Sequence, residues 1–161
     1  VNHDLNSAGS LSMIRILRKY ELRAQMMKAL GLDVGTKTIG LAIGVIERKL
    51  AQPLITLARK SVRKDTDEMV VICEAHQITH LVVGLPIELS GEEGRSARLA
   101  RQVGDMLAEK TGLPLAYHDE SFSTVEAEMR LQTLGKNEWQ RKEMIDQIAA
   151  IVILEDWWFE Q

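Results

Sequence analysis

The chain has 161 residues, 45% of them apolar and 27% charged, which is typical of one folded globular domain. A single cysteine, Cys73, excludes an intramolecular disulfide framework and a cysteine-based zinc site, and it favours a reducing, cytoplasmic compartment. Because the net charge is −3, a nucleic-acid partner would have to be bound by a local basic patch or through metal ions. No apolar run approaches the roughly 18 residues that a membrane span needs.

The first part of the chain differs in composition from the rest. The stretch "VNHDLNSAGSLS" is polar and aperiodic, and "MIRILRKYELRAQMM" has the pattern of a short basic helix. This break predicts an extension or leader over residues 1–26, poorly ordered, ahead of a single domain over residues 27–161.

A regular pattern begins at Lys28 and predicts an antiparallel meander. Three strands are expected, over residues 28–33, 39–46 and 50–58. A tight turn from Gly35 to Thr38 joins the first two strands. Gly40 and Gly44 indicate a close backbone approach or a bulge, and Pro53 favours an edge position for the third strand.

The second half of the domain predicts helices alternating with buried strands. Asp65 with Glu68, and Ser123 with Glu126, have the spacing of capping boxes at helix starts. Strands are expected over 78–84 and in "LPLAYHDE", and helices over 95–111 (ended by Gly112), from Ser123 to Gly135, and over 138–157. The order β-β-β-α-β-α-β-α-α predicts an α/β fold, a mixed sheet with helices covering its faces.

Three carboxylates occupy informative places. Asp33 ends the first strand, Glu120 ends the last strand beside Asp119, and Asp146 lies early in the last helix. The carboxyl ends of parallel strands share one edge of a sheet, where ligands bind, and a helix crossing that edge brings Asp146 within reach. Taken singly, each has an ordinary explanation: a turn, a helix cap, or an i,i+4 pair with Lys142.

Clustered carboxylates repel one another strongly unless they share cations. Oxygen ligands suit hard divalent ions such as Mg²⁺ or Mn²⁺. Two such ions about 4 Å apart can activate a water and take up charge on the leaving oxygen of a phosphodiester. The acidic set therefore predicts metal-dependent phosphodiester hydrolysis.

Basic residues provide candidates for phosphate contacts. Lys37 is so near Asp33 that it is the first candidate. Arg95 and Arg98 share a helix face with Arg101, which indicates either a solvated face or a row that positions phosphates. His80 and His118 fall in or beside strands, where packing is the favoured explanation.

Four segments resemble those of the YqgF-like family, whose members are named Holliday junction resolvases or pre-16S rRNA nucleases. They are "LDVGTKTIGLAIG", "VVGLPIELSGEEG", "DESFSTVEA" and "IDQIAAIVILEDW", in the family's order and spacing. The resemblance implies a ribonuclease H-like fold with a five-stranded sheet. It also implies a bacterial cytoplasmic nuclease that trims the 5′ end of the 16S rRNA precursor with a divalent metal as cofactor.

The family's acidic positions fall on Asp33, Glu120 and Asp146 as catalytic and metal-binding residues. Gly35 and Lys37 match its first block, and Lys142 matches a basic position in the last; with Arg95 and Arg98 they form the expected substrate-binding set. The third block departs from the family, because Ser121 stands where an arginine is usual. A serine cannot replace a bidentate guanidinium at a phosphate.

Several alternatives stay open on sequence alone. The substrate is pre-rRNA, with ribosomal precursor particles as partners, or branched DNA at a four-way junction. No membrane partner is expected for either substrate. Resolving a two-fold junction favours a homodimer, but a monomer is equally compatible with the sequence. The lesser alternatives are a nucleic-acid-binding module without catalysis and an actin-like ATPase domain. The ATPase lacks support because no second glycine-rich phosphate loop follows.

Overall fold

A computed structural model describes residues 6–24, 26–88, 90–119, 123–135 and 137–161. Its centre is a five-stranded sheet of order β3-β2-β1-β4-β5. The strands are β1 (Lys28–Val34), β2 (Thr38–Val45), β3 (Leu50–Ala58), β4 (His80–Leu85) and β5 (Leu115–Asp119). The predicted mixed sheet is confirmed, with three strands in an antiparallel meander and β4 and β5 parallel to β1.

Pro53 lies in the edge strand β3, as the missing amide donor requires. The pairing of β2 with β3 shifts between Leu41 and Ala42, and Ala42 pairs with Pro53 after this irregularity. A short 3₁₀ helix, Ile46–Arg48, connects the two strands.

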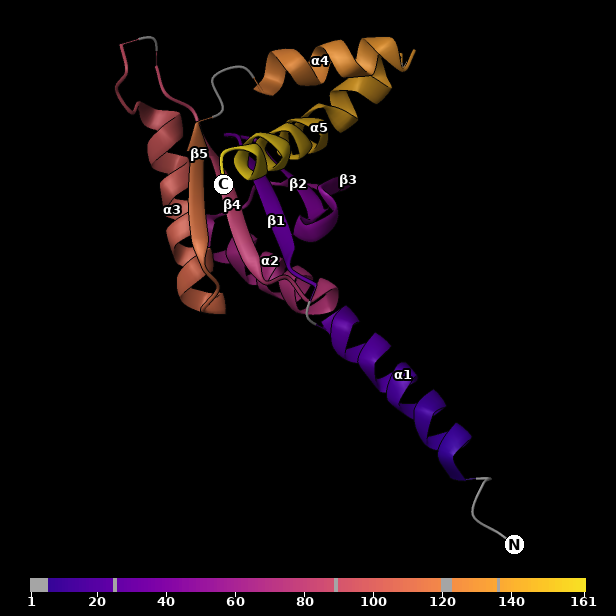
Figure 1. Cartoon of the computed structure of the whole chain (residues 1–161). Coiled ribbons are helices and arrows are strands. Elements are labelled where there is room, and N and C mark those ends of the chain that lie inside the picture. Colours follow the sequence, from indigo (N-terminus) through magenta and orange to yellow (C-terminus); the bar gives the residue numbers. More distant parts are fainter. Residues whose placement is uncertain (1–5, 25, 89, 120–122, 136) are drawn as a thin grey trace, which may run out of the picture.

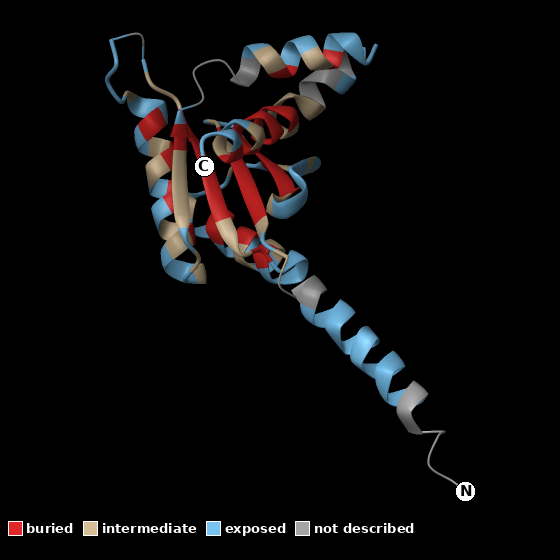
Figure 2. Ribbon diagram, in the orientation of Figure 1, coloured by how far each residue is buried: buried red, intermediate tan, exposed pale blue. Residues whose placement is uncertain are grey.

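Helices cover both faces of the sheet (Figure 1). On one face α2 (Val62–His76) and α3 (Arg95–Thr111) pack on the apolar cluster that contains Leu30 and Leu32. On the other face α5 (Glu138–Phe159) packs on the sheet, in the cluster that contains Ala29, and α4 (Ser123–Thr133) packs against α5. Successive β1 side chains alternate between the two cores because neighbouring strand residues point to opposite faces. The central strands β1, β2 and β4 and the adjoining part of α5 are the most buried parts in Figure 2.

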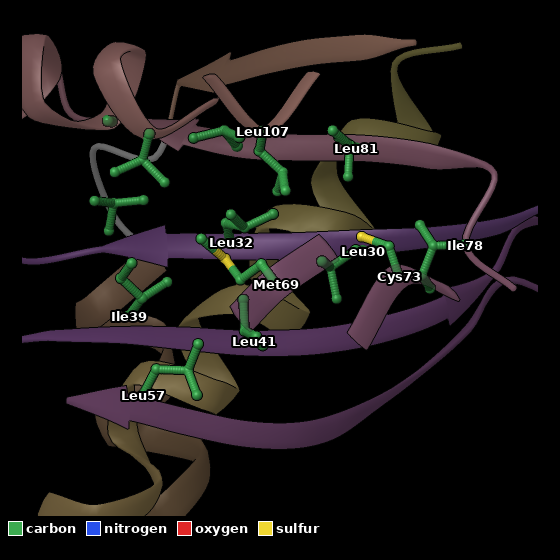
Figure 3. Packing of buried hydrophobic residues seen from close by; sticks show 14 of the residues in the cluster. Leu30, Leu32, Ile39, Leu41, Leu57, Met69, Cys73, Ile78, Leu81 and Leu107 are labelled. Atoms are coloured by element: carbon green, nitrogen blue, oxygen red, sulfur yellow. The ribbon is translucent and has the colours of Figure 1, made fainter. Parts of the chain in front are cut away.

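The core under α2 is made of large aliphatic side chains. Met69 and Cys73 of α2 lie against Leu30, Leu32 and Leu41 of the sheet, as Figure 3 shows. Burying each side chain of this size stabilises the fold by about 1.5–3 kcal/mol before conformational entropy is subtracted. This layer is the rigid base on which β1 and its carboxyl end rest.

Two helix boundaries test the sequence rules. The predicted capping box at Asp65 is wrong, because α2 begins earlier: Ser61 is the N-cap, and its side chain accepts a hydrogen bond from the Lys64 amide. Asp65 is instead 1% exposed within the first turn. Gly112 ends α3 with φ at 68°, as predicted. The capping box predicted at Ser123 lies outside the described side chains.

The N-terminal helix α1 (Asn6–Ala24) projects away from the sheet and its covering helices (Figure 1). It is longer than the short basic helix that the sequence suggested, because it also includes part of the preceding polar stretch, and the poor order expected for residues 1–26 stays a prediction. Apolar side chains along it, such as Leu11 and Leu17, are exposed. The division of the chain near residue 27 stays a prediction. None of the described helices combines the length and apolar character needed to cross a bilayer.

Candidate active site

Asp33 lies at the carboxyl end of β1 and on the face that α5 covers. A side chain at Gly31 would meet Ala150 and Leu154 of α5. Asp33 is two residues further along the same strand, so it points to the same side. Its partner in the β1–β2 register is Gly40.

The close packing of α5 on Gly40 places the backbone of Asp146 next to the strand pair formed by Asp33 and Gly40. A Cβ atom built on Gly40 would lie 2.2 Å from the backbone carbonyl carbon and oxygen of Asp146. The backbone of α5 therefore rests directly on β2, at the residue that pairs with Asp33. Only glycine permits this approach, because any side chain would occupy the space of the helix backbone.

Two hydrogen bonds fix this part of α5 over the sheet. Thr38 Oγ1 donates to Asp146 Oδ2 at 2.5 Å. Gln147 Nε2 donates to Thr56 Oγ1 at 3.0 Å, and Thr56 pairs with Gly40 in the β2–β3 register. The Asp146 carboxylate is thus held by a side chain from the start of β2, while its neighbour is held from β3.

These supporting residues were missed by the sequence analysis. Thr38 and Asp146 are separated by 108 positions, and no spacing rule connects them. The one usable signal was Gly40, which was interpreted as either a close backbone approach or a bulge; the structure shows the close approach and identifies α5 as its partner.

The third predicted carboxylate, Glu120, lies outside the described residues, and so does Ser121. The described part of β5 ends at Asp119, which pairs with Leu85 of β4. Because β4 is parallel to β1, with Val83 beside Leu32, β4 and β1 end at the same edge of the sheet. The position of Glu120 at that edge stays a prediction.

The carboxylates that the structure describes are the type of ligand that a hard cation prefers, but they do not by themselves form a complete metal site. Asp33 and Asp146 offer carboxylate oxygens from a strand and a helix, which are rigid elements. Among the side chains that the structure describes, no three His, Cys, Asp or Glu groups lie close enough to hold a metal ion. A complete metal site therefore needs a further ligand, and Glu120 is the predicted one.

The turn after Asp33 is held by Arg59, the residue that follows β3. The Gly35 amide donates to the Thr38 carbonyl at 2.8 Å, and the Arg59 amide donates to the Lys37 carbonyl at 2.9 Å. Arg59 Nη1 also donates to the Gly35 carbonyl at 2.9 Å. The side chain of Lys37 is exposed on this turn.

Arg59 is itself held by a buried ion pair. Its Nε atom donates to Asp65 Oδ2 at 2.7 Å, and the two side chains are 10% and 1% exposed. The Lys60 amide donates to the other Asp65 oxygen at 3.0 Å. The sequence analysis assigned no role to Arg59 and took Asp65 for a helix cap.

The predicted row of arginines lies on the surface of α3. Arg95 and Arg98 are exposed on α3, in the layer on the opposite face of the sheet from α5. Arg101 is engaged locally: it forms an ion pair with Glu93, whose pKa it lowers, and lies 4.7 Å from the centre of the Tyr117 ring. A substrate role for Arg95 and Arg98 stays a prediction. The backbone of Lys142 lies in α5 one turn before Asp146, and its side chain is outside the described set.

A second polar region lies at the far end of α5. His118 is 8% exposed, as its predicted packing requires, and its Nδ1 atom lies 3.3 Å from Glu160 Oε2. A pocket of about 440 Å³ beside it is lined by Tyr117, His118, Asp119, Asp156, Phe159 and Glu160. Burial raises the pKa of Asp156, and the nearby Glu126 adds to the shift. This concentration of carboxylates disfavours a phosphate backbone there.

Comparison with known proteins gives sequence relatives across the domain. A family model described as "RuvX: Holliday junction resolvase" matches residues 27–160. A protein of Myxococcus xanthus (strain DK1622) is 38% identical over 131 residues, covering 81% of this chain and 87% of its own length. One of Lactococcus lactis subsp. cremoris (strain MG1363) is 37% identical over 132 residues, covering 81% and 92%. Both relatives bear the name "Putative pre-16S rRNA nuclease".

Solved structures share the fold at low sequence identity. RuvC of T. thermophilus, solved in complex with a Holliday junction substrate, superposes with a TM-score of 0.56 at 15% identity, covering 83% of this chain and 94% of that one. Fowlpox virus resolvase, solved with Holliday junction DNA, gives a TM-score of 0.52 at 7% identity, with coverage of 83% and 98%. These likenesses identify the ribonuclease H-like fold and nothing finer.

Proposed function

The chain belongs to the RuvX family, and from this premise we propose that it is a metal-dependent nuclease whose active site contains Asp33, Asp146 and Glu120. The observation that carries the proposal is the close approach at Gly40, which brings a strand-end carboxylate and a helix carboxylate together. Carboxylates on neighbouring backbone positions repel each other, and a shared divalent cation would offset that repulsion.

Each residue has a defined part in the proposed reaction. Asp33, Asp146 and Glu120 would hold Mg²⁺ or Mn²⁺, which when bound supplies an activated water and charge stabilisation at the leaving oxygen. Thr38 keeps the Asp146 carboxylate in one orientation. Lys37, exposed on the turn, places a positive charge where a substrate phosphate approaches.

The substrate we favour is the 5′ end of the 16S rRNA precursor, processed in the cytoplasm on free RNA or on ribosomal precursor particles. The names of relatives at 37–38% identity over most of the domain support this choice. The second candidate is a four-way DNA junction, which the description of the family supports. Both substrates offer the phosphodiester that the acidic site is built to cleave.

One experiment tests both candidates. Labelled RNA carrying the precursor 5′ sequence and a labelled four-way junction are incubated side by side with the protein in Mg²⁺, in Mn²⁺ and in EDTA. We expect cleavage of the RNA that depends on the metal and is lost in Asp146→Asn, which keeps the size of the side chain but removes its charge. Preferential cleavage of the junction would move the assignment to the second candidate.

A matched control comes from the same helix. Asp156→Asn makes the identical chemical change on α5, in the pocket beside His118, and is expected to cleave at the wild-type rate. Cleavage that persists in EDTA, or that is unchanged in Asp146→Asn, would contradict the proposed site.

A further inference from the structure

Two backbone carbonyl groups of the turn between β1 and β2 accept hydrogen bonds from Arg59. The Gly35 carbonyl accepts from Arg59 Nη1 at 2.9 Å, and the Lys37 carbonyl accepts from the Arg59 amide at 2.9 Å. Arg59 in turn is anchored by Asp65, which is almost fully buried on α2. The orientation of the turn is therefore set by a charged pair in the protein interior and not by solvent.

The hydrogen bond from Arg59 to the Gly35 carbonyl also fixes the direction of the next backbone amide, that of Thr36. The Gly35 carbonyl and the Thr36 N–H belong to one peptide group, and the chain has no cis peptide bond among its described residues. In a planar trans peptide the two groups point in opposite directions. Since the carbonyl points to Arg59, the Thr36 N–H points away from it, toward the exposed side of the turn.

The Thr36 amide is also available. Thr36 is exposed, and within the part of the chain that the structure describes its N–H donates to no acceptor. Its neighbour Lys37 is exposed as well, and the turn follows directly on Asp33. An outward amide beside an ammonium group is a combination that binds a phosphate oxygen.

We propose that Arg59 is a positioning residue that turns the Thr36 amide outward, so that this amide and Lys37 together bind one phosphate of the nucleic-acid substrate. The inference rests on the proposed nuclease function and specifies how its substrate is held. Asp33 and Asp146 are fixed separately, by the β1–β2 pairing and by Thr38. Loss of Arg59 should therefore weaken substrate binding and leave the chemical step largely intact.

The test must separate positioning from folding. Removing Arg59 alone would leave the buried Asp65 carboxylate without its cation, which destabilises the fold. The double variant Arg59→Gln/Asp65→Asn removes both charges and keeps two groups that can hydrogen-bond to each other. Thermal unfolding should show that this variant folds, and we expect its KM and its Kd for RNA in EDTA to rise about tenfold while kcat stays within about twofold, since one hydrogen bond to a charged phosphate is lost.

Two further variants complete the design. Lys60→Gln removes one positive charge next to Arg59, from an exposed side chain whose partner Glu68 lies 3.7 Å away, and should bind RNA as the wild type does. Thr36→Pro deletes the amide donor itself and should weaken binding to the same degree as the double variant. A folded double variant that binds as tightly as Lys60→Gln would overturn the role of Arg59.

Failure of this inference can be told from failure of the proposed function. If the wild type cleaves RNA in Mg²⁺ but the double variant matches Lys60→Gln in both KM and Kd, only the role of Arg59 is lost. If the wild type cleaves neither RNA nor the junction in any metal, the nuclease proposal is lost. The binding measurement in EDTA still decides the role of Arg59 in that case, because it needs no catalysis.

Discussion

The Thr38 hydroxyl supports the candidate active site although it is not one of the proposed metal ligands. Its hydrogen bond to Asp146 Oδ2 leaves the other carboxylate oxygen available to a cation. Thr38→Val keeps the shape of the side chain and removes the donor. We expect kcat to fall about tenfold with little change in KM, because outer partners of metal ligands typically contribute 10–100-fold.

The control for this change is Thr133→Val on α4, where the exposed hydroxyl donates to the Met129 carbonyl at 3.0 Å. It should leave kcat unaltered. Steady-state kinetics on both variants provide the comparison, and equal kcat values for Thr38→Val and the wild type would remove Thr38 from the support of Asp146.

Lys37 acts through charge, so its effect should depend on salt. Lys37→Ala removes one phosphate contact, and the slope of log K against log salt concentration should become shallower by about one unit. Titrations of RNA at several salt concentrations measure this slope. An unchanged slope, with weaker binding at every salt concentration, would assign Lys37 a structural role.

At the scale of elements, the decisive contact is that of α5 with β2. Gly40 admits the helix backbone so closely that an added methyl group would overlap the carbonyl of Asp146. Gly40→Ala must therefore displace α5, which we expect to destabilise the protein by about 1–3 kcal/mol and to separate Asp146 from Asp33.

Chemical denaturation and cleavage assays together check this prediction. Gly9→Ala is the matched control, because a side chain at Gly9 on α1 would meet no atom within 4 Å. It should alter neither stability in the domain nor activity. Full activity in Gly40→Ala would mean that the close approach of α5 is not needed for the site.

The element scale also explains which sequence predictions failed. Asp65 has the right spacing for a cap, but Ser61 lies earlier and reaches the Lys64 amide. Asp65 is drawn instead into the interior by Arg59, which spacing rules cannot anticipate because the two residues lie on different elements.

At the scale of the whole molecule, a cysteine in the core on the α2 side of the sheet can report on opening of the fold. Cys73, on the α2 side, is 4% exposed, and burial raises the pKa of its thiol to about 11. The thiolate is the reactive form, so at pH 8 both the raised pKa and the burial suppress alkylation.

We therefore expect Cys73 to react with iodoacetamide only as fast as the molecule opens. The rate should rise steeply across the denaturant transition, as measured by mass spectrometry of the alkylated protein. Rapid labelling of the native protein at pH 8 would show that the layer formed by α2 opens independently of the sheet.

The amino-acid sequence by itself determined the local structure and the chemistry of the candidate residues. Hydrophobic periodicity predicted the strands and helices, Pro53 predicted the edge strand, and the residue types at Asp33 and Asp146 indicated oxygen ligands. These features follow from short-range geometry, in which neighbouring residues decide the outcome.

Only the tertiary structure decided which residues meet. The helix that carries Asp146 could have crossed the sheet at many angles, and its packing on Gly40, with Thr38 as partner across 108 positions, selects one of them. The same holds for Arg59, whose interior pairing with Asp65 orients the turn that follows Asp33. Contacts of this kind depend on how whole layers pack, which residue spacing along the chain does not encode.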